Sequence, residues 1–391
     1  MDLTLEAHSS SEVTMNILIA PDSFKGSVTA KEAAKAMEKG IRKVDPDADM
    51  QLVPMADGGE GTMSSLVEAT NGSVYEVEVQ DPLGRNIVAQ YGVTGDGQTA
   101  IVELASASGL HTLLKEELDP RVASTYGTGQ LIAHVLNQGL DNFIICLGGS
   151  ATNDGGTGLL SALGFRFLDQ DGKELKPGGL ALKHLHTIDQ SEVKQKVREA
   201  AFQVACDVNN PLIGSNGASA VFGPQKGATL DMVQQLDQSL EVLADCIKNQ
   251  TGKCVHQYPG AGAAGGTAAG LLAFLDAELK PGIRLVIETL HLEELLSHHH
   301  FDVLFTGEGR IDGQTASGKV VAGLAELAKQ YKIPTIALAG TMENDLKSLY
   351  EKGLTAAFSI TDGPMTLEDA MKDGEFLIAK QAEQIYRLLK I

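Results

Sequence analysis

Apolar and polar positions along this chain follow two different periods, and their order predicts an α/β fold. From Asn16 a short apolar run, an amphipathic segment, a second apolar run and a second amphipathic segment follow one another, which predicts β-α-β-α. The pattern resumes near Val303 and continues through the C-terminal part. We therefore expect an open, parallel, Rossmann-like sheet built from both chain ends, with helices on both faces. The predicted strands of this sheet are 17–20, 50–55, 303–306, 335–339 and 356–360.

The middle of the chain begins with a different pattern. Three segments of alternating apolar and polar residues, with a turn after the first of them, are typical of antiparallel strands: 73–80, 86–93 and 99–104. This predicts an inserted second α/β (α+β) domain, residues 78–291, within a discontinuous first domain, residues 15–77 and 292–391. We interpret the polar residues 1–14 as a leader that is disordered or was added ahead of Met15.

Composition and charge argue against some classes of partner and favour others. A chain of 391 residues exceeds one ordinary core, which agrees with two domains. The formal net charge of −20 argues against nucleic acid or an anionic membrane as partner, because phosphate backbones are held by excess Lys and Arg. Small-molecule ligands are expected instead. The four scattered cysteines form no metal or disulfide pattern, which favours a reducing cytoplasm.

One uncharged stretch, residues 257–275, approaches the length of a membrane span and carries small residues at every fourth position. Its first half is Gly and Ala, which is too weakly apolar, so we predict a glycine-rich loop that leads into a helix. Residues 260–265 also spell G-x-G-x-x-G. Because no convincing strand precedes them, we attribute this motif to close packing or nucleotide approach and not to a dinucleotide fingerprint.

Two motifs follow the first two predicted strands. Ser23, Lys25 and Ser27 come directly after the first strand, where an open α/β sheet binds ligands, and are placed to meet an anion. The alternative is a capped turn, with Ser27 or Thr29 as N-cap. Asp57 and Glu60 stand between glycines after the second strand and suit a metal or a substrate hydroxyl. A plain Asp-Gly turn is the alternative there.

A third motif, residues 148–156, lies between an apolar strand and an apolar helix. Its glycines and hydroxyl side chains predict a backbone cradle for phosphates, with Asp154 available for a cation. Residues 125–129 open another helix and offer further N–H donors or merely a capping turn. The residues expected to contribute to the cradle are Gly148, Gly149, Ser150, Thr152, Asn153 and Gly155.

A fourth motif, residues 306–319, supplies Glu308, Arg310, Asp312 and Lys319 as candidates for metal and phosphate contacts. Residues 313–319 match G-x-x-x-x-G-K, but Val320 stands where a P-loop needs Ser or Thr, and the predicted strand ends several residues too early. We therefore reject a true P-loop.

Three further segments carry polar candidates. Asp207 follows the strand 201–205 and suits a metal ligand, a base or a structural role. Lys226 lies in a basic turn at 222–227 that we expect to contact ligand. The histidines at 298–300 are interpreted as a solvated surface.

Taken together and in this order, the motifs 22–25, 57–61, 149–156, 223–227 and 307–310 with Asp312 resemble those of the type I glycerate kinases, from Met15 to the C-terminus. The resemblance implies transfer of the γ-phosphate of ATP to D-glycerate, with 2-phosphoglycerate as product. It also implies a flavodoxin-like domain interrupted by a second α/β domain.

Within that framework we predict roles for individual residues. Lys25, with Ser23, would hold the glycerate carboxylate, and Mg²⁺ would assist in-line transfer in an interdomain cleft that closes on substrate. Asp57, Glu60 and Asp207 all remain open as the base. The predicted sets are catalytic Asp207, Lys25 and Asp57; substrate-binding Ser23, Lys25, Ser27, Asp57, Glu60 and Arg310; ATP-binding Gly148, Gly149, Ser150, Thr152, Asn153, Gly155, Lys226, Glu308 and Lys319; and metal-binding Asp154, Asp207 and Asp312.

Two other classes of protein compete with the kinase interpretation. An NAD-dependent dehydrogenase would use the 260–265 motif, and the missing strand argues against it. A non-catalytic sugar-acid sensor would bind without ATP turnover. The sequence leaves the oligomeric state open between monomer and dimer.

Overall fold

The computed structural model describes residues 15–59, 61–313, 315 and 319–391, so the leader and Glu60 lie outside the described residues. The chain divides into two compact units: Met1–Met55 with Glu293–Ile391, and Ala56–Leu292. Within the described ranges, no helix is long and apolar enough to cross a bilayer.

The first unit contains a five-stranded parallel sheet in the order β13-β12-β11-β1-β2. Numbered within the unit, this order is 2-1-3-4-5, the flavodoxin-like order, so the predicted fold class is confirmed. The strands are β1 Asn16–Ile19, β2 Asp49–Leu52, β11 Val303–Ile311, β12 Thr335–Met342 and β13 Leu354–Ser359. The helices are α1 Ala30–Arg42, α11 Leu292–His298, α12 Val320–Gln330, α13 Lys347–Lys352, α14 Leu367–Lys372 and α15 Gly374–Leu389.

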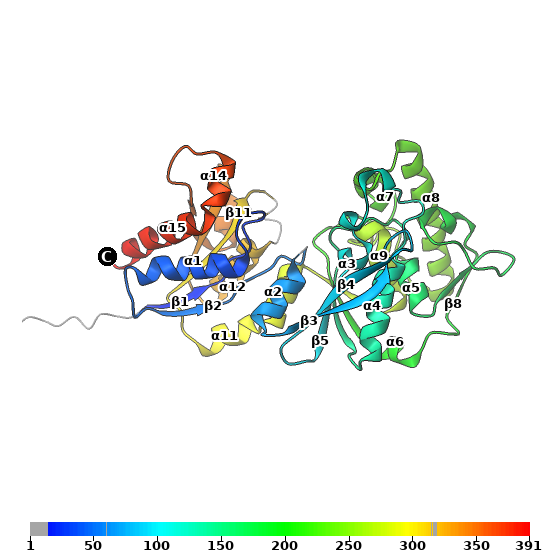
Figure 1. Cartoon of the computed structure of the whole chain (residues 1–391), viewed down its shortest axis with the longest axis horizontal. Helices are drawn as coiled ribbons and strands as arrows, with labels where there is room; N and C mark the ends of the chain where they lie inside the picture. Colours follow the sequence, from blue (N-terminus) through cyan, green and yellow to red (C-terminus); the bar gives the residue numbers. More distant parts are fainter. Residues whose placement is uncertain (1–14, 60, 314, 316–318) are drawn as a thin grey trace, which may run out of the picture. The chain divides into compact units, whose positions relative to one another are not determined.

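Helices cover both faces of this sheet. α1 and α15 lie side by side on one face, and Gly40 allows their close approach, because a Cβ there would meet the Ala379 carbonyl oxygen at 2.0 Å (Figure 1). α12 and α13 cover the other face, where they pack on Ala337 and Ala339 of β12. Thr29 is the N-cap of α1 in a capping box with Glu32, as one of the two alternatives for that loop predicted.

β11 is five residues longer than predicted, and the argument that the strand ends too early for a P-loop was wrong. The predicted strand stopped at residue 306, before the glycines of 307–309, yet these residues stay in the strand, where β12 lies alongside them. A Cβ on Gly307 would meet the Leu338 carbonyl oxygen at 2.3 Å, and a Cβ on Gly340 would meet that of Gly309 at 2.6 Å. Val320 at the start of α12 still lacks the hydroxyl that a P-loop requires.

The second unit contains a six-stranded mixed sheet in the order β10-β9-β6-β5-β4-β3 and a two-stranded hairpin. β10, β9, β6 and β5 run parallel, and β4 and β3 run antiparallel to their neighbours. The strands are β3 Ser73–Gln80, β4 Asn86–Val93, β5 Thr99–Glu103, β6 Asn142–Cys146, β7 Arg166–Leu168, β8 Thr187–Asp189, β9 Ala201–Ala205 and β10 Glu278–Lys280.

The helices of the second unit fall on two sides of its sheet. α2 packs on β3, β4 and β5 and α10 on β9, whereas α4, α5, α8 and α9 contribute to the large core on the other side. The α-helices are α2 Thr62–Ala69, α3 Ala105–Ser108, α4 Tyr126–Asn137, α5 Thr157–Ala162, α6 Gln195–Glu199, α7 Ala218–Phe222, α8 Leu230–Thr251, α9 Ala263–Phe274 and α10 Gly282–Thr289. Short 3-10 turns occupy Leu110–Thr112, Lys115–Glu117, Gly179–His184 and Pro224–Lys226.

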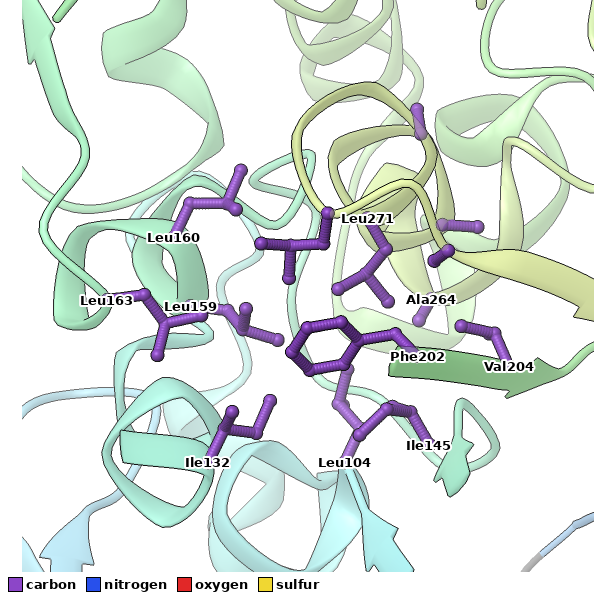
Figure 2. Close-up of a cluster of buried hydrophobic side chains, with 14 of the residues drawn as sticks. Leu104, Ile132, Ile145, Leu159, Leu160, Leu163, Phe202, Val204, Ala264 and Leu271 are labelled. Carbon is purple, nitrogen blue, oxygen red and sulfur yellow. The ribbon is translucent and has the colours of Figure 1, made fainter. Parts of the chain in front are cut away.

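Aromatic and branched side chains fill that core. Figure 2 shows the Phe202 ring of β9 among side chains that include Leu159 of α5 and Leu271 of α9. Phe202 also stacks on Phe143 of β6, with ring centroids 5.0 Å apart. The core fixes the parallel strands whose carboxyl ends carry the candidate site described below.

The chain passes from the first unit to the second at residue 56, which is earlier than the predicted boundary at residue 78. Residues 56–77 cluster with the second unit, because α2 packs on its sheet and β3 belongs to it. Gly92 of β4 makes room for this helix: a Cβ there would meet Val67 at 2.4 Å and Met63 at 2.9 Å.

Candidate active site

A pocket of about 200 Å³ lies at the carboxyl ends of β6 and β9, within the second unit. Five of the predicted site residues line it together: Gly148, Gly149, Ser150, Asp207 and Lys226. Gly58, Gly59, Phe222, Gln225, Ala263 and Ala264 are among the other residues of its wall. Glycines of two separate loops thus expose backbone to one cavity at the sheet edge where α/β proteins bind ligands.

Asp154 holds the glycine-rich loop between β6 and α5 in shape. Its carboxylate is fully buried and accepts hydrogen bonds from Thr125 N at 2.8 Å, Thr125 Oγ1 at 2.9 Å, Gly156 N at 3.1 Å and Gly158 N at 3.2 Å. Burial raises its pKa, and the four hydrogen bonds oppose that shift. A carboxylate surrounded by donors in this way suits loop fixation. Its predicted metal role stays a prediction that these contacts do not favour.

Lys226 holds the same loop from the pocket side. Its side chain is only 1% exposed, and Nζ donates to Ser150 Oγ at 2.8 Å and to the Thr152 carbonyl oxygen at 2.6 Å. Burial lowers the pKa of Lys226 to about 7, while the charge of Asp154 acts in the opposite direction. The protonated amine therefore adds positive charge beside the cavity below about pH 7, and above it the neutral amine can still donate to the loop.

The start of α9 packs against the other side of the loop. Ala264, Gly265 and Gly266 all have left-handed backbone conformations, and Gly155 N donates to the Gly265 carbonyl oxygen at 3.0 Å. A Cβ on Gly265 would lie 2.1 Å from the Thr152 carbonyl oxygen. The G-x-G-x-x-G motif is therefore a packing device, and no strand lies among residues 252–262 that precede α9.

Two buried polar atoms of the loop have no hydrogen-bond partner among the described residues: Thr152 Oγ1 and Asn153 Oδ1. Asn153 Nδ2 donates to Ser219 Oγ at 3.0 Å, which fixes the side-chain amide, while its Oδ1 has no described hydrogen-bond partner. Unsatisfied buried acceptors of this kind are expected to meet a ligand or an ordered water. By contrast, Thr125 N and Oγ1 already donate to Asp154, and Thr125 makes no side-chain cap for α4, so in the 125–129 segment neither alternative is decided.

Carboxylates gather at the same sheet edge. Asp57 Oδ1 accepts from Gly59 N at 3.0 Å, and Asp207 Oδ1 accepts from Gly282 N at 2.9 Å. Glu103, the last residue of β5, lies level with Cys146 of β6. Burial raises the pKa of the Cys146 thiol well above its usual value, and the charges of Glu103, Asp207 and Asp57 add to the rise. Sequence reasoning missed Glu103, although its place at a strand end was the available signal.

In the first unit, Ser23, Lys25 and Ser27 lie in the tight turn between β1 and α1. Phe24 and Val28 exchange backbone hydrogen bonds across this turn, and Lys25 is exposed at its tip. Ser27 Oγ donates to the Met371 carbonyl oxygen, which ties the turn to α14. The geometry therefore leaves Lys25 accessible and gives Ser27 a structural contact.

The β11–α12 connection carries the other predicted residues of this unit. Glu308 is buried and accepts from Thr315 Oγ1 at 2.7 Å. The side chain of Arg310 is 67% exposed and pairs with Asp312 at 3.2 Å and with Glu343 at 3.7 Å. Lys319 is the N-cap residue of α12.

For magnesium, the described residues contain no group of three or more His, Cys, Asp or Glu side chains arranged to hold a metal ion. Asp154 is occupied by its four donors, whereas Asp207 lines the pocket and can offer an oxygen atom. This fits Mg²⁺ that arrives with nucleotide phosphates and takes one or two protein carboxylates, and it does not fit a protein-built metal cage.

The fold and site define a class: an α/β protein with a pocket lined by glycine-rich loops at the carboxyl ends of parallel strands. The glycerate kinase family model matches residues 17–390, and the chain belongs to that family. It is accordingly an enzyme of the kinase class, as the motifs predicted.

Named relatives agree with this membership. The chain is 48% identical to the glycerate kinase of Halalkalibacterium halodurans, covering 94% of this chain and 97% of the relative. It is 45% identical to the glycerate 2-kinase of Escherichia coli, covering 96% and 98%. Among solved structures, a Salmonella typhimurium LT2 protein assigned as glycerate kinase 2 matches with a TM-score of 0.88 at 45% identity, covering 96% of this chain and 98% of that one.

Proposed function

We propose that this protein transfers the γ-phosphate of ATP to the 2-hydroxyl of D-glycerate and releases 2-phosphoglycerate and ADP. Family membership supports the kinase class, and the name of the Escherichia coli relative supports the position of phosphorylation. The observation that carries the proposal furthest is the pocket itself, in which a buried lysine and the backbone of Gly148, Gly149 and Ser150 meet. Such a site suits a phosphate group, since backbone N–H groups bind anions and a nearby anion favours the protonated form of the lysine.

Phosphoryl transfer needs alignment of the acceptor hydroxyl with the phosphate and neutralisation of the charge that develops. In our proposal the loop of residues 148–156 cradles the ATP phosphates, and Asp154 and Lys226 keep that loop in place. This revises the predicted metal role of Asp154 to a structural one. Lys25 with Ser23 binds the carboxylate of glycerate, and Lys319 or Arg310 balances charge in the transition state. Glu308 was predicted from the sequence to bind ATP. In our proposal it acts on ATP indirectly, through its hydrogen bond with Thr315.

Magnesium would be held by the nucleotide phosphates and by Asp207, with Asp312 as the second predicted ligand. When bound, it neutralises charge on the phosphate oxygens. Asp57 and Asp207 both stay candidates for the base, since each carboxylate accepts a backbone N–H, from Gly59 and from Gly282 respectively. Glu60, outside the described residues, stays a candidate.

An ADP-coupled assay with ATP, magnesium and D-glycerate tests the function, with the product identified by ³¹P NMR against both monophosphate standards. Product at the 2-position is the expected result. Product at the 3-position would keep the kinase and overturn the acceptor geometry. Lack of turnover with glycerate, alongside turnover of another sugar acid, would overturn the substrate.

Two further expectations belong to this proposal. Closure of the two domains on the substrates stays a prediction, and small-angle X-ray scattering with and without saturating ligands tests it. We also propose a cytoplasmic location, which the four free cysteines support, because thiols persist in reducing compartments.

A further inference from the structure

Glu103 ends β5 with its side chain on the α2 side of the six-stranded sheet. Its neighbours Val102 and Leu104 belong to the large core on the opposite side, and successive side chains of a strand alternate between faces. Glu103 Oε1 accepts a hydrogen bond from Met63 N at 3.0 Å. The carboxylate of one strand end therefore reaches the first turn of α2.

α2 lacks a cap of its own. Its N-cap residue is Gly61, which has no side chain to accept from the first N–H groups of the helix. Met63 is the second helical residue, the position that an N-cap side chain ordinarily serves. Glu103 fills this role from 40 residues away along the chain, and its negative charge suits the positive end of the helix dipole.

The turn that leads into α2 also packs closely against the start of α10 and the end of β9. Gly58 has a φ of +87°, and a Cβ on it would lie 2.4 Å from Gly282 Cα and 3.2 Å from Ala205 Cβ. Gly282 begins α10, and its N–H is bound by Asp207. Two carboxylates at the sheet edge thus bind the N-terminal turns of the two helices between which Gly58 lies.

We propose that Glu103 is a positioning residue for the phosphoryl transfer: by capping α2 from β5, it fixes the turn Asp57–Gly59 at the wall of the pocket. Neither the predicted site nor the family resemblance included this residue. The inference rests on the proposed function, since it assigns Asp57 to the glycerate side of the reaction. Glu103 is not among the residues that line the pocket, and the contact that carries this inference is its hydrogen bond to the helix.

Substitution of Glu103 by Gln and by Ala separates positioning from direct chemistry. Gln keeps an oxygen that accepts from Met63 N but has no charge, whereas Ala removes the acceptor. We expect Glu103→Ala to lower kcat/KM for D-glycerate about 30-fold, because small displacements of aligned groups cost large factors in rate. Glu103→Gln should stay within about threefold of the parent, and KM for ATP should change less than about twofold in both.

Glu78→Ala is the matched control, because Glu78 is an exposed residue of the same sheet that accepts from Asn86 of the neighbouring strand at 2.7 Å. Hydrogen exchange, followed by mass spectrometry on the peptide from Gly58 to Leu66, gives a readout independent of turnover. Exchange there should speed up in Glu103→Ala and remain at the parent rate in Glu103→Gln and in the control.

Three results would overturn the inference. Parent-like kinetics and exchange in Glu103→Ala would show that the cap does not matter. A loss in Glu103→Gln as deep as in Glu103→Ala would point to direct contact with a metal or proton. A slower reaction with unchanged exchange would also contradict positioning. If the parent enzyme fails to phosphorylate glycerate while exchange follows the expected pattern, the proposed function has failed and the capping contact has not.

Discussion

The β6–α5 loop and the β11–α12 connection are built from the same kinds of residues, glycines with hydroxyl, acidic and basic side chains, yet they hold their charges differently. At the first loop, the buried Asp154 binds Thr125 before α4 and backbone N–H groups around the start of α5, and the buried Lys226, from the turn Pro224–Lys226, binds the loop from outside. In the second, Arg310 is largely exposed and its partners are surface carboxylates. Buried charges define the shape of one site, whereas exposed charges remain available for reaction at the other.

The largest effect is expected from Asp154→Asn. An amide replaces one acceptor oxygen with an NH₂ donor, which must face the N–H and hydroxyl donors that now bind the carboxylate. We expect the free energy of unfolding to fall by about 3 kcal/mol, measured by urea titration, because the buried donors lose their partner. Asp171→Asn, in an exposed turn, should change it by less than about 0.5 kcal/mol. Full stability combined with loss of magnesium-dependent turnover would restore the metal role of Asp154.

A smaller loss should follow Gly265→Ala. The substitution adds a Cβ at a φ of +64° and 2.1 Å from the Thr152 carbonyl oxygen, so both strain and a backbone clash result. We expect about 2 kcal/mol of destabilisation and weaker ATP binding by calorimetry. Gly172→Ala is the control, because Gly172 has a φ of +75° with open space around its Cβ position, and it should cost about 1 kcal/mol. Equal losses in the two variants would show that the contact between α9 and the loop is unimportant.

Lys226→Met should change how stability depends on pH. The pKa of Lys226 is about 7 in the folded protein and 10.5 in the unfolded chain, so between these values the unfolded chain binds a proton that the folded protein lacks. The free energy of unfolding of the parent should therefore rise with pH relative to that of the variant, by up to about 1.4 kcal/mol per pH unit between pH 7.5 and 9.5. Below pH 7 the difference should level off. Parallel stability curves across this range would mean that the lysine stays charged in the loop.

A substitution in the exposed β11–α12 connection should lower activity without changing the free energy of unfolding. Arg310→Gln is expected to change the free energy of unfolding by less than about 0.5 kcal/mol, since its ion pairs lie at the surface. Turnover should fall about 100-fold if the guanidinium balances transition-state charge. Arg387→Gln, which removes a surface ion pair of α15, controls for the loss of charge. Unchanged kcat in Arg310→Gln would remove this residue from the proposed mechanism.

Much of the fold could be predicted because alternation of apolar residues follows the pleat of a strand. The bounds of β3, β4 and β9 agree with the predicted segments 73–80, 86–93 and 201–205. β11 was predicted too short because a glycine in isolation suggests a turn. In the structure Gly307 serves close approach to β12, and the Cβ position of Gly309 faces Phe24 and Lys25 of the turn after β1, so both depend on segments elsewhere in the chain.

The site was predictable by location and less so by role. Strand ends indicated where Ser150 and Asp207 would lie, and both line one pocket together with Lys226, which was predicted in an exposed-looking basic turn and is buried in the structure. That Asp154 and Lys226 bind the loop could not be predicted, because sequence does not reveal which way a charged side chain faces. Glu103 was missed for a related reason: the N–H that it caps is 40 residues away.

The flavodoxin-like sheet also has a consequence for synthesis on the ribosome. Its β1 pairs with β11, with Ile17 opposite Val303, so the first two strands have no third partner until the entire second unit has been made. At a synthesis rate of about 5–20 residues per second this interval is roughly 10 to 50 seconds. During that time the apolar residues of β1 lack the strand that pairs with them in the folded sheet, so the earliest strands are the part of this unit that waits longest for its partner.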